Sequence, residues 1–272
     1  MWRGMADDLA DFVRRHDPDR FLCAIFAPAD RRGALLALIA FNHELARARE
    51  AATHPTAALI RLQWWREVVE AAAAGRPARR HEVAAPLHTA IAAGVLDPRD
   101  LTAMADAREA EAEEDGIPTR AAFDAYLRGT AGGLAVAAGR VLGAPAVALP
   151  ALQAIGASYG LAGVLRSVAR HAAAGRCLLP ADALAEAGLT PEAVAQDPAS
   201  AAPVVHALTA EGAARLAAVD RALIPRAAVA AALPGVLARR DLARLAAGRT
   251  VPAPRRFGDR AAVTLAGLRG WV

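Results

Sequence analysis

Apolar residues recur along the chain at steps of three and four positions, the spacing that places side chains on one face of an α-helix. The alternating pattern of a β-strand is not found, and proline or glycine separates one apolar segment from the next. The pattern therefore predicts an all-α protein with helices over residues 5–16, 19–26, 29–52, 56–74, 82–93, 99–115, 120–142, 151–174, 201–224, 226–247 and 258–270.

Proline and glycine also mark where these helices begin and end. Asp-Pro pairs at Asp17, Asp97 and Asp197 are typical helix starts, whereas a glycine after an apolar segment favours a helix end. We expect such ends at Gly75, Gly94, Gly143, Gly175, Gly188 and Gly248. A further group is expected where two helices approach closely, namely Gly129, Gly132, Gly133, Gly139 and Gly143. Since no Ser- or Gly-rich linker divides the chain, we expect a single domain over 1–272.

Composition strengthens the helical prediction and limits the function. Alanine occupies 76 of 272 positions, and all 32 basic residues are arginine. The net charge is only +4, and aromatic residues make up 4% of the chain, which is too few for a base-stacking surface. We therefore expect no nucleic-acid partner. Two cysteines, Cys23 and Cys177, provide no disulfide framework, so a reducing, cytoplasmic location is expected.

Three stretches differ from the average in charge. Residues 141–165 carry no charge, but Pro145 and Pro150 interrupt them, so a buried helix is favoured over a membrane span. Residues 97–124 hold nine acids and three arginines, which predicts a solvated face. Residues 220–272 hold ten arginines and three acids. A soluble surface is favoured there, and peripheral contact with an anionic membrane at its inner face is the alternative.

Three segments, in this order, resemble the squalene/phytoene synthase family of trans-isoprenyl diphosphate synthases. Residues 37–50 are ALIAFNHELARARE, residues 126–143 are YLRGTAGGLAVAAGRVLG, and residues 155–180 are IGASYGLAGVLRSVARHAAAGRCLLP. The resemblance covers most of the chain. It implies an isoprenoid synthase-like bundle of helices around a central cavity.

The two aspartate-rich motifs of that family are altered in this chain. In the family, carboxylates four residues apart on two facing helices hold the Mg²⁺ ions that neutralise a departing diphosphate. The matching positions here are Ala46 and Glu50 on one helix, and Ser167 and His171 on the other. Arg47 and Arg170 stand beside them. The resemblance therefore implies no catalytic residue, no metal site and no cofactor.

A narrower resemblance explains these replacements. The run Phe41-Asn42-His43-Glu44-Leu45-Ala46, followed by LIRLQWWREVVE at 59–70 and MADAREAEAEED at 104–115, is similar to a branch of the family that lacks the aspartates. That branch includes a mitochondrial assembly factor for respiratory complex I. It implies a non-catalytic protein that assists assembly of a respiratory complex by binding a partner subunit, an assembly protein or a lipid in its cavity.

The resemblance and the helical pattern together place a set of side chains at this cavity. For Trp65, Tyr126 and Tyr159, the alternative to contact with the cavity is packing in the core. For Arg166, the alternative to anion binding is an ion pair with Glu44 or Glu50 across a helix interface. The expected ligand-binding residues are Asn42, Glu50, Trp65, Tyr126, Tyr159, Arg166, Arg170, His171 and Arg176.

Two other functions remain open at this stage. One is an active prenyltransferase that binds Mg²⁺ through Glu44, Glu50 and either Glu109 or Glu111. The other is a metal-free binder of a prenyl diphosphate or a phospholipid, in which the arginines hold the anionic group as forked donors.

Overall fold

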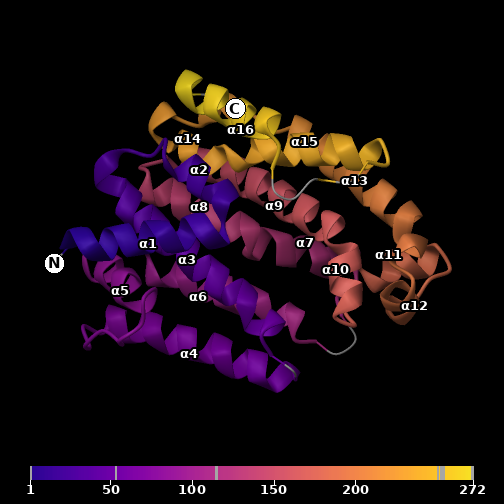
Figure 1. The fold of residues 1–272 in the computed structure, drawn as a ribbon, viewed down its shortest axis with the longest axis horizontal. Coiled ribbons are helices and arrows are strands. Elements are labelled where there is room, and N and C mark those ends of the chain that lie inside the picture. The colour runs from indigo at the N-terminus through magenta and orange to yellow at the C-terminus, as the bar shows by residue number, and fades with distance from the viewer. Residues whose placement is uncertain (1, 53, 114–115, 250, 252–254, 271–272) are drawn as a thin grey trace.

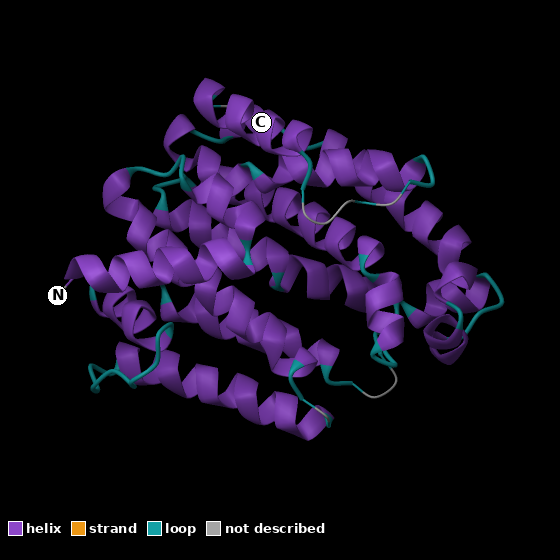
Figure 2. Cartoon of the chain, viewed as in Figure 1, coloured by secondary structure: helices purple, strands orange, loops and turns teal. Residues whose placement is uncertain are grey.

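The computed structural model describes residues 2–52, 54–113, 116–249, 251 and 255–270, and side chains from residue 8 onward. Every regular element in this part is helical, so the all-α class is confirmed (Figure 2). The α-helices are α1 (Trp2–His16), α2 (Pro18–Ala24), α3 (Ala29–Glu50), α4 (Pro55–Ala73), α5 (Ala84–Ala92), α6 (Pro98–Ala107), α7 (Arg120–Gly129), α8 (Ala131–Val141), α9 (Leu149–Arg166), α10 (Val168–Ala173), α11 (Ala181–Glu186), α12 (Pro191–Gln196), α13 (Ala202–Ala217), α14 (Val229–Ala232), α15 (Pro234–Ala246) and α16 (Phe257–Arg269).

Helix α9 lies at the centre of the bundle and packs along α7, α8, α13 and α15. Helices α4 and α5 lie on one side of the molecule, and α15 and α16 lie on the opposite side (Figure 1). Residues 146–166, which include α9, form the one stretch of the described chain whose length and hydropathy would allow a membrane span. Because these residues pack against four other helices, they serve as a central core helix, as the two prolines predict.

Glycine and alanine allow α8 and α9 to lie against each other. A Cβ atom added at Gly156 would lie 2.7 Å from the Cβ of Ala135, and one at Gly160 would lie 2.8 Å from the Cβ of Ala131. The expected close approaches are found at Gly129, Gly132, Gly133 and Gly139, where an added Cβ would meet a neighbouring helix. Gly143 is different, because it meets nothing and ends α8 with a φ of +76°.

Two expected helices are each divided, and both breaks are at polar residues. The segment 120–142 is broken at Thr130, whose hydroxyl donates to the carbonyl of Tyr126 at 2.7 Å. The segment 151–174 is broken at Ser167, which separates α9 from α10. At Thr130 the side chain bonds to a backbone carbonyl, which competes with the hydrogen bonds of the helix and is not visible in apolar periodicity. The hydroxyl of Ser167 instead accepts a hydrogen bond from Arg170 Nη2 at 3.2 Å.

Other boundaries differ because short turns replace continuous helix. Residues 108–111 form a 3₁₀ turn after α6, and the expected helix end at 115 lies outside the described residues. Residues 221–223 and 226–228 are also 3₁₀ turns, and Pro234 begins a new helix within 226–247. Helices α11 and α12 were not predicted, because their six residues are too short for a clear period.

Candidate functional site

A cavity of about 950 Å³ lies between the N-terminal helices α1 to α3 and the helices α7, α9 and α10. Arg255 and Arg260, near the C-terminus, complete its rim. The sequence-based expectation of a central cavity agrees with this arrangement. Of the nine residues expected at the cavity, eight line it, namely Asn42, Glu50, Tyr126, Tyr159, Arg166, Arg170, His171 and Arg176.

Trp65 is the exception. It is 3% exposed and packs edge-to-face against Phe41, with ring centroids 5.5 Å apart, and against Trp64 at 4.7 Å. The structure therefore places Trp65 in the core behind α3 and not in the cavity wall. An indole is the largest apolar surface in this helix, and burial in the core removes more of it from water than a cavity rim would.

One wall of the cavity is built around Glu111, which is 7% exposed. The carboxylate accepts hydrogen bonds from Arg108 Nη1 at 2.5 Å and from the hydroxyl of Tyr126 at 2.7 Å. Arg108 also reaches the side-chain oxygen of Asn42 at 3.4 Å. Burial and the neighbouring Glu111 raise the pKa of Tyr126. This wall therefore holds a neutral phenol and an arginine–carboxylate pair.

Arg176 faces the same wall, but its Nη2 atom has no hydrogen-bond partner there. Its Nη2 lies 3.8 Å from Glu111 Oε2, which is an ion-pair distance but too long for a hydrogen bond. That nitrogen and the Nε of Arg108 are both buried, and neither has a hydrogen-bond partner among the described residues. Burial outweighs Glu111 and lowers the pKa of Arg176. These N–H groups are thus left without compensation in the folded protein, beside a cavity lined by other cations.

The opposite wall is built around Asp17, Asp19 and Arg20. Asp19 accepts hydrogen bonds from the hydroxyl of Tyr159 and from Arg255 Nε, both at 2.9 Å. Asp17 binds Arg20 at 2.8 Å, and the guanidinium of Arg20 lies 4.7 Å from the centre of the Tyr159 ring. Burial raises the pKa of Tyr159. Both acids of this wall are therefore neutralised by arginine.

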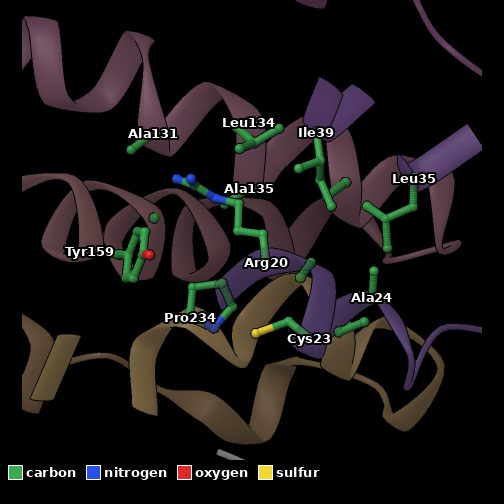
Figure 3. Close-up of a pocket in the computed structure, with 14 residues that line it drawn as sticks. Arg20, Cys23, Ala24, Leu35, Ile39, Ala131, Leu134, Ala135, Tyr159 and Pro234 are labelled. Carbon is green, nitrogen blue, oxygen red and sulfur yellow. The ribbon is translucent and has the colours of Figure 1, made fainter. Parts of the chain in front are cut away.

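The Arg20 and Tyr159 side chains also line a second, much smaller pocket. Figure 3 shows the Arg20 side chain running past Ala135 toward Tyr159, with Leu134 and Ile39 on the far wall. The volume of this pocket is about 30 Å³, enough for about one water molecule. Beyond the Arg20–Tyr159 pair, this pocket therefore leaves little free space.

Arg166 pairs with an acid that the sequence did not suggest. Its Nη1 lies 2.9 Å from Asp241 Oδ2, and the sequence-based alternatives Glu44 and Glu50 are wrong. Asp241 is 0% exposed and also binds Arg255 and Arg244. Through these ion pairs Asp241, on α15, holds α9 and the segment before α16 together, although the three are far apart in the sequence.

The positions that match the family's metal motifs do face the cavity. Ala46, Glu50, Ser167 and His171 all line it, and Glu50 is the one carboxylate among them. The other cavity carboxylates, which are Asp17, Asp19 and Glu111, are bound by arginine.

A magnesium cluster does not fit this set of side chains. Mg²⁺ requires oxygen ligands in near-octahedral geometry, and arginines bind every cavity carboxylate among the described residues except Glu50. No group of three or more His, Cys, Asp or Glu residues in the described part of the chain is placed to hold a metal ion. Of the other candidates, Glu109 binds Arg66 and Glu44 lies 3.8 Å from Arg47, and neither lines the cavity.

The charge of the cavity lining is strongly positive. Among the described residues it contains nine arginines against four carboxylates. Sequence reasoning did not place Arg20, Arg108 or Arg255 at the cavity, and it named Glu111 only as a possible metal ligand. The acidic stretch 97–124 was expected to be a solvated face, and this is wrong for Glu111. The i, i+3 spacing of Arg108 and Glu111 was the available signal for a local pair.

Two histidines that line the cavity have pKa values below the usual range. The rings of His16 and His43 stack with centroids 4.8 Å apart, and burial, together with His16 and Arg47, lowers the pKa of His43 to about 4. Burial, Arg176 and Arg170 lower the pKa of His171 to about 4 as well. Both imidazoles are therefore neutral in the folded protein at pH 7.

These two histidines predict a loss of stability in mild acid. In the unfolded chain they titrate near the ordinary value of 6.5, so between pH 6.5 and 4 the unfolded state binds protons that the folded state does not. The free energy of unfolding is expected to fall over that range. The double variant His43→Gln, His171→Gln should show a flatter dependence in urea titrations, whereas the exposed His206→Gln should retain the wild-type slope. Equal slopes in all three proteins would contradict the assignment.

Comparison with known proteins places these features in a family. Residues 13–265 match the sequence profile described as squalene/phytoene synthase. The chain is 28% identical over 183 residues to the mouse protein named NADH dehydrogenase (ubiquinone) complex I, assembly factor 6, covering 67% of this chain and 55% of that protein. The human counterpart is also 28% identical, over 173 residues. The chain spans about half the length of these curated relatives.

Solved structures show the same fold at low sequence identity. A dehydrosqualene synthase crystallised with ligand has a TM-score of 0.71 at 13% identity, covering 98% of this chain and 96% of its own. The squalene synthase HpnC from Alicyclobacillus acidocaldarius has a TM-score of 0.61 at 18% identity, covering 98% of this chain and 95% of its own. The expected isoprenoid synthase-like fold is confirmed.

Proposed function

The chain belongs to the squalene/phytoene synthase family, and we propose that it assists the assembly of respiratory complex I without condensing prenyl diphosphates. One observation carries this proposal. The four cavity positions that match the metal motifs hold a single carboxylate, Glu50, while the surrounding fold is retained. Loss of the ligands removes the means of stabilising a departing diphosphate.

Complex I is proposed as the partner because of the proteins to which this chain is similar. The mouse and human proteins that match two thirds of this chain are named as complex I assembly factors. Fold alone does not determine activity, so the proposal depends on this match together with the altered site. The role that fits the cavity is reversible binding of a partner segment or a lipid during assembly, with no bond made or broken.

Deletion of the gene tests this role in the organism of origin. We expect membranes from the deletion strain to lose most NADH:quinone oxidoreductase activity and the assembled complex on native gels. Succinate oxidation should be unchanged, since it does not pass through that complex. Restoration by a plasmid copy completes the expected result. Normal amounts of complex I in the deletion strain would overturn the proposal.

The competing enzymatic function has its own test. Purified protein incubated with labelled farnesyl diphosphate and magnesium is expected to give no condensation product. Sustained, Mg²⁺-dependent turnover would refute the non-catalytic proposal, and Glu50→Ala would then show whether that carboxylate contributes. A squalene synthase assayed in parallel provides the positive control.

A second function is favoured by the unpartnered arginine N–H groups, and it is binding of an anionic lipid or prenyl diphosphate without metal. Arg176 Nη2 and Arg108 Nε are buried in the cavity wall and lack hydrogen-bond partners there. Phosphate oxygens would satisfy both. Calorimetric titration with farnesyl diphosphate in EDTA should give measurable heat, and absence of binding would remove this function.

A further inference from the structure

Helix α16 carries an apolar stripe on its outer face. Phe257 is 86% exposed, Leu268 64% and Leu265 48%, and the small Ala261 lies between them. At 100° per residue these four side chains fall within an arc of about 80° around the helix axis. Singly exposed apolar residues are common on protein surfaces, but a stripe along a whole helix marks a contact surface.

The orientation of this stripe is fixed by the buried face of the same helix. Asp259 is 0% exposed and accepts hydrogen bonds from Arg240 Nε at 2.6 Å and Arg244 Nη2 at 2.5 Å. Gly267 lies directly against the ring of Phe26. Helix α16 is therefore held on α15 and α2, at the edge of the molecule (Figure 1), and its apolar stripe is exposed to solvent.

Arginines flank the stripe on both sides. Arg260 lies on one side of it and Arg269 on the other, and Arg256 precedes the first residue of the helix. All three are exposed, and none makes an ion pair within the described residues. Asp259, the one acid of α16, points inward. The outer face thus combines apolar and cationic groups with no carboxylate of its own.

The inward and outward arginines of this region differ in their partners. Arg240 and Arg244 bind the buried Asp259, and Arg255 binds Asp19 and Asp241. The outer arginines would need a negatively charged partner on another molecule. A layer of lipid phosphates supplies such charge on both sides of an apolar stripe that enters the acyl region.

We propose that the outer face of α16 docks on a membrane surface that contains anionic lipids. An apolar stripe with arginine on both edges is the pattern of helices that lie in the plane of the interface. Arg260 belongs to both this face and the cavity rim, so docking would bring the cavity mouth to the lipid surface. The proposal does not rest on a role in complex I assembly.

Vesicle flotation with the purified full chain tests this surface. Wild-type protein should float with vesicles of phosphatidylcholine and phosphatidylglycerol in equal parts, and remain unbound with phosphatidylcholine alone. Added salt should weaken binding, because it screens the arginines. Arg256→Gln with Arg269→Gln should lower the partition coefficient by about fivefold for each arginine removed. Phe257→Ser with Leu268→Ser should lower it by on the order of tenfold or more.

Matched substitutions elsewhere on the surface serve as controls. Ile60 on α4 is 66% exposed, as Leu268 nearly is, and Arg80 is exposed with no ion pair in the described residues. Ile60→Ser and Arg80→Gln should float as the wild type does, and circular dichroism should show all variants folded. Absence of flotation overturns the proposal, as does equal binding to neutral vesicles or binding that the α16 variants leave unchanged. Self-association or capture of a protein through α16 without vesicle binding would also overturn it.

Discussion

Replacing Asp241 with asparagine is expected to lower the free energy of unfolding by about 3–5 kcal/mol. Asp241 is fully buried and binds Arg166 at 2.9 Å, Arg244 at 3.2 Å and Arg255 at 2.5 Å. The substitution keeps the shape of the side chain but leaves three arginines without their shared negative charge. Arg166 is left with no ion-pair partner among the described residues, whereas Arg244 keeps Asp259 and Arg255 keeps Asp19, and breaking a buried charge pair is strongly destabilising.

Urea unfolding followed by circular dichroism measures this effect. A matched control is Asp124→Asn, since Asp124 forms a solvent-exposed ion pair with Arg215 in which the side chains are 39% and 46% exposed. Exposed pairs contribute about 0–1 kcal/mol, so the control should change stability little. If Asp241→Asn were no more destabilising than this control, the buried acid would not be the centre that holds α9 and α15 together.

The fold was largely accessible from the sequence because alanine-rich helices are separated by local signals. Gly75, Gly94 and Gly188 end helices with positive φ, as expected from their spacing alone. The breaks at Thr130 and Ser167 were not predicted, because the apolar spacing continues through both residues. Both residues line the cavity, so the departures from regular helix occur where the wall must turn.

The site could be predicted only in outline. The resemblance placed eight of nine side chains at the cavity, since the face on which a helix position lies transfers with the fold. It could not supply the partners of those side chains. Asp241 is 75 residues from Arg166, whereas the sequence analysis offered Glu44 or Glu50 for the same arginine. Pairing across the bundle depends on the order of helices in space, which periodicity does not encode.

The buried arginines of this protein fall into two groups, which differ in whether a carboxylate neutralises their charge. Arg166 and Arg255 share the buried Asp241, and the hydrogen bonds that Arg255 donates to Asp241 and Asp19 raise the pKa of Arg255. Arg176 has the opposite shift, since burial lowers its pKa. The folded protein therefore disfavours the charged form of Arg176, and a group kept at a cost to stability is a candidate for ligand binding.

Replacing Arg176 with glutamine is accordingly expected to weaken ligand binding without lowering the stability of the fold. The affinity for farnesyl diphosphate in EDTA should fall by about 10- to 100-fold, the range for loss of charged hydrogen bonds to an anion. The free energy of unfolding should stay equal or rise slightly, because the substitution removes a poorly compensated buried charge.

Isothermal calorimetry and urea unfolding on the same preparations measure both quantities. Arg80→Gln removes an exposed arginine away from the cavity and should alter neither. Titration with inorganic diphosphate separates the contribution of the anionic group from that of the prenyl chain. Unchanged affinity in Arg176→Gln would place the anion elsewhere, whereas a loss of stability as large as that expected for Asp241→Asn would show that Arg176 is a structural partner of Glu111.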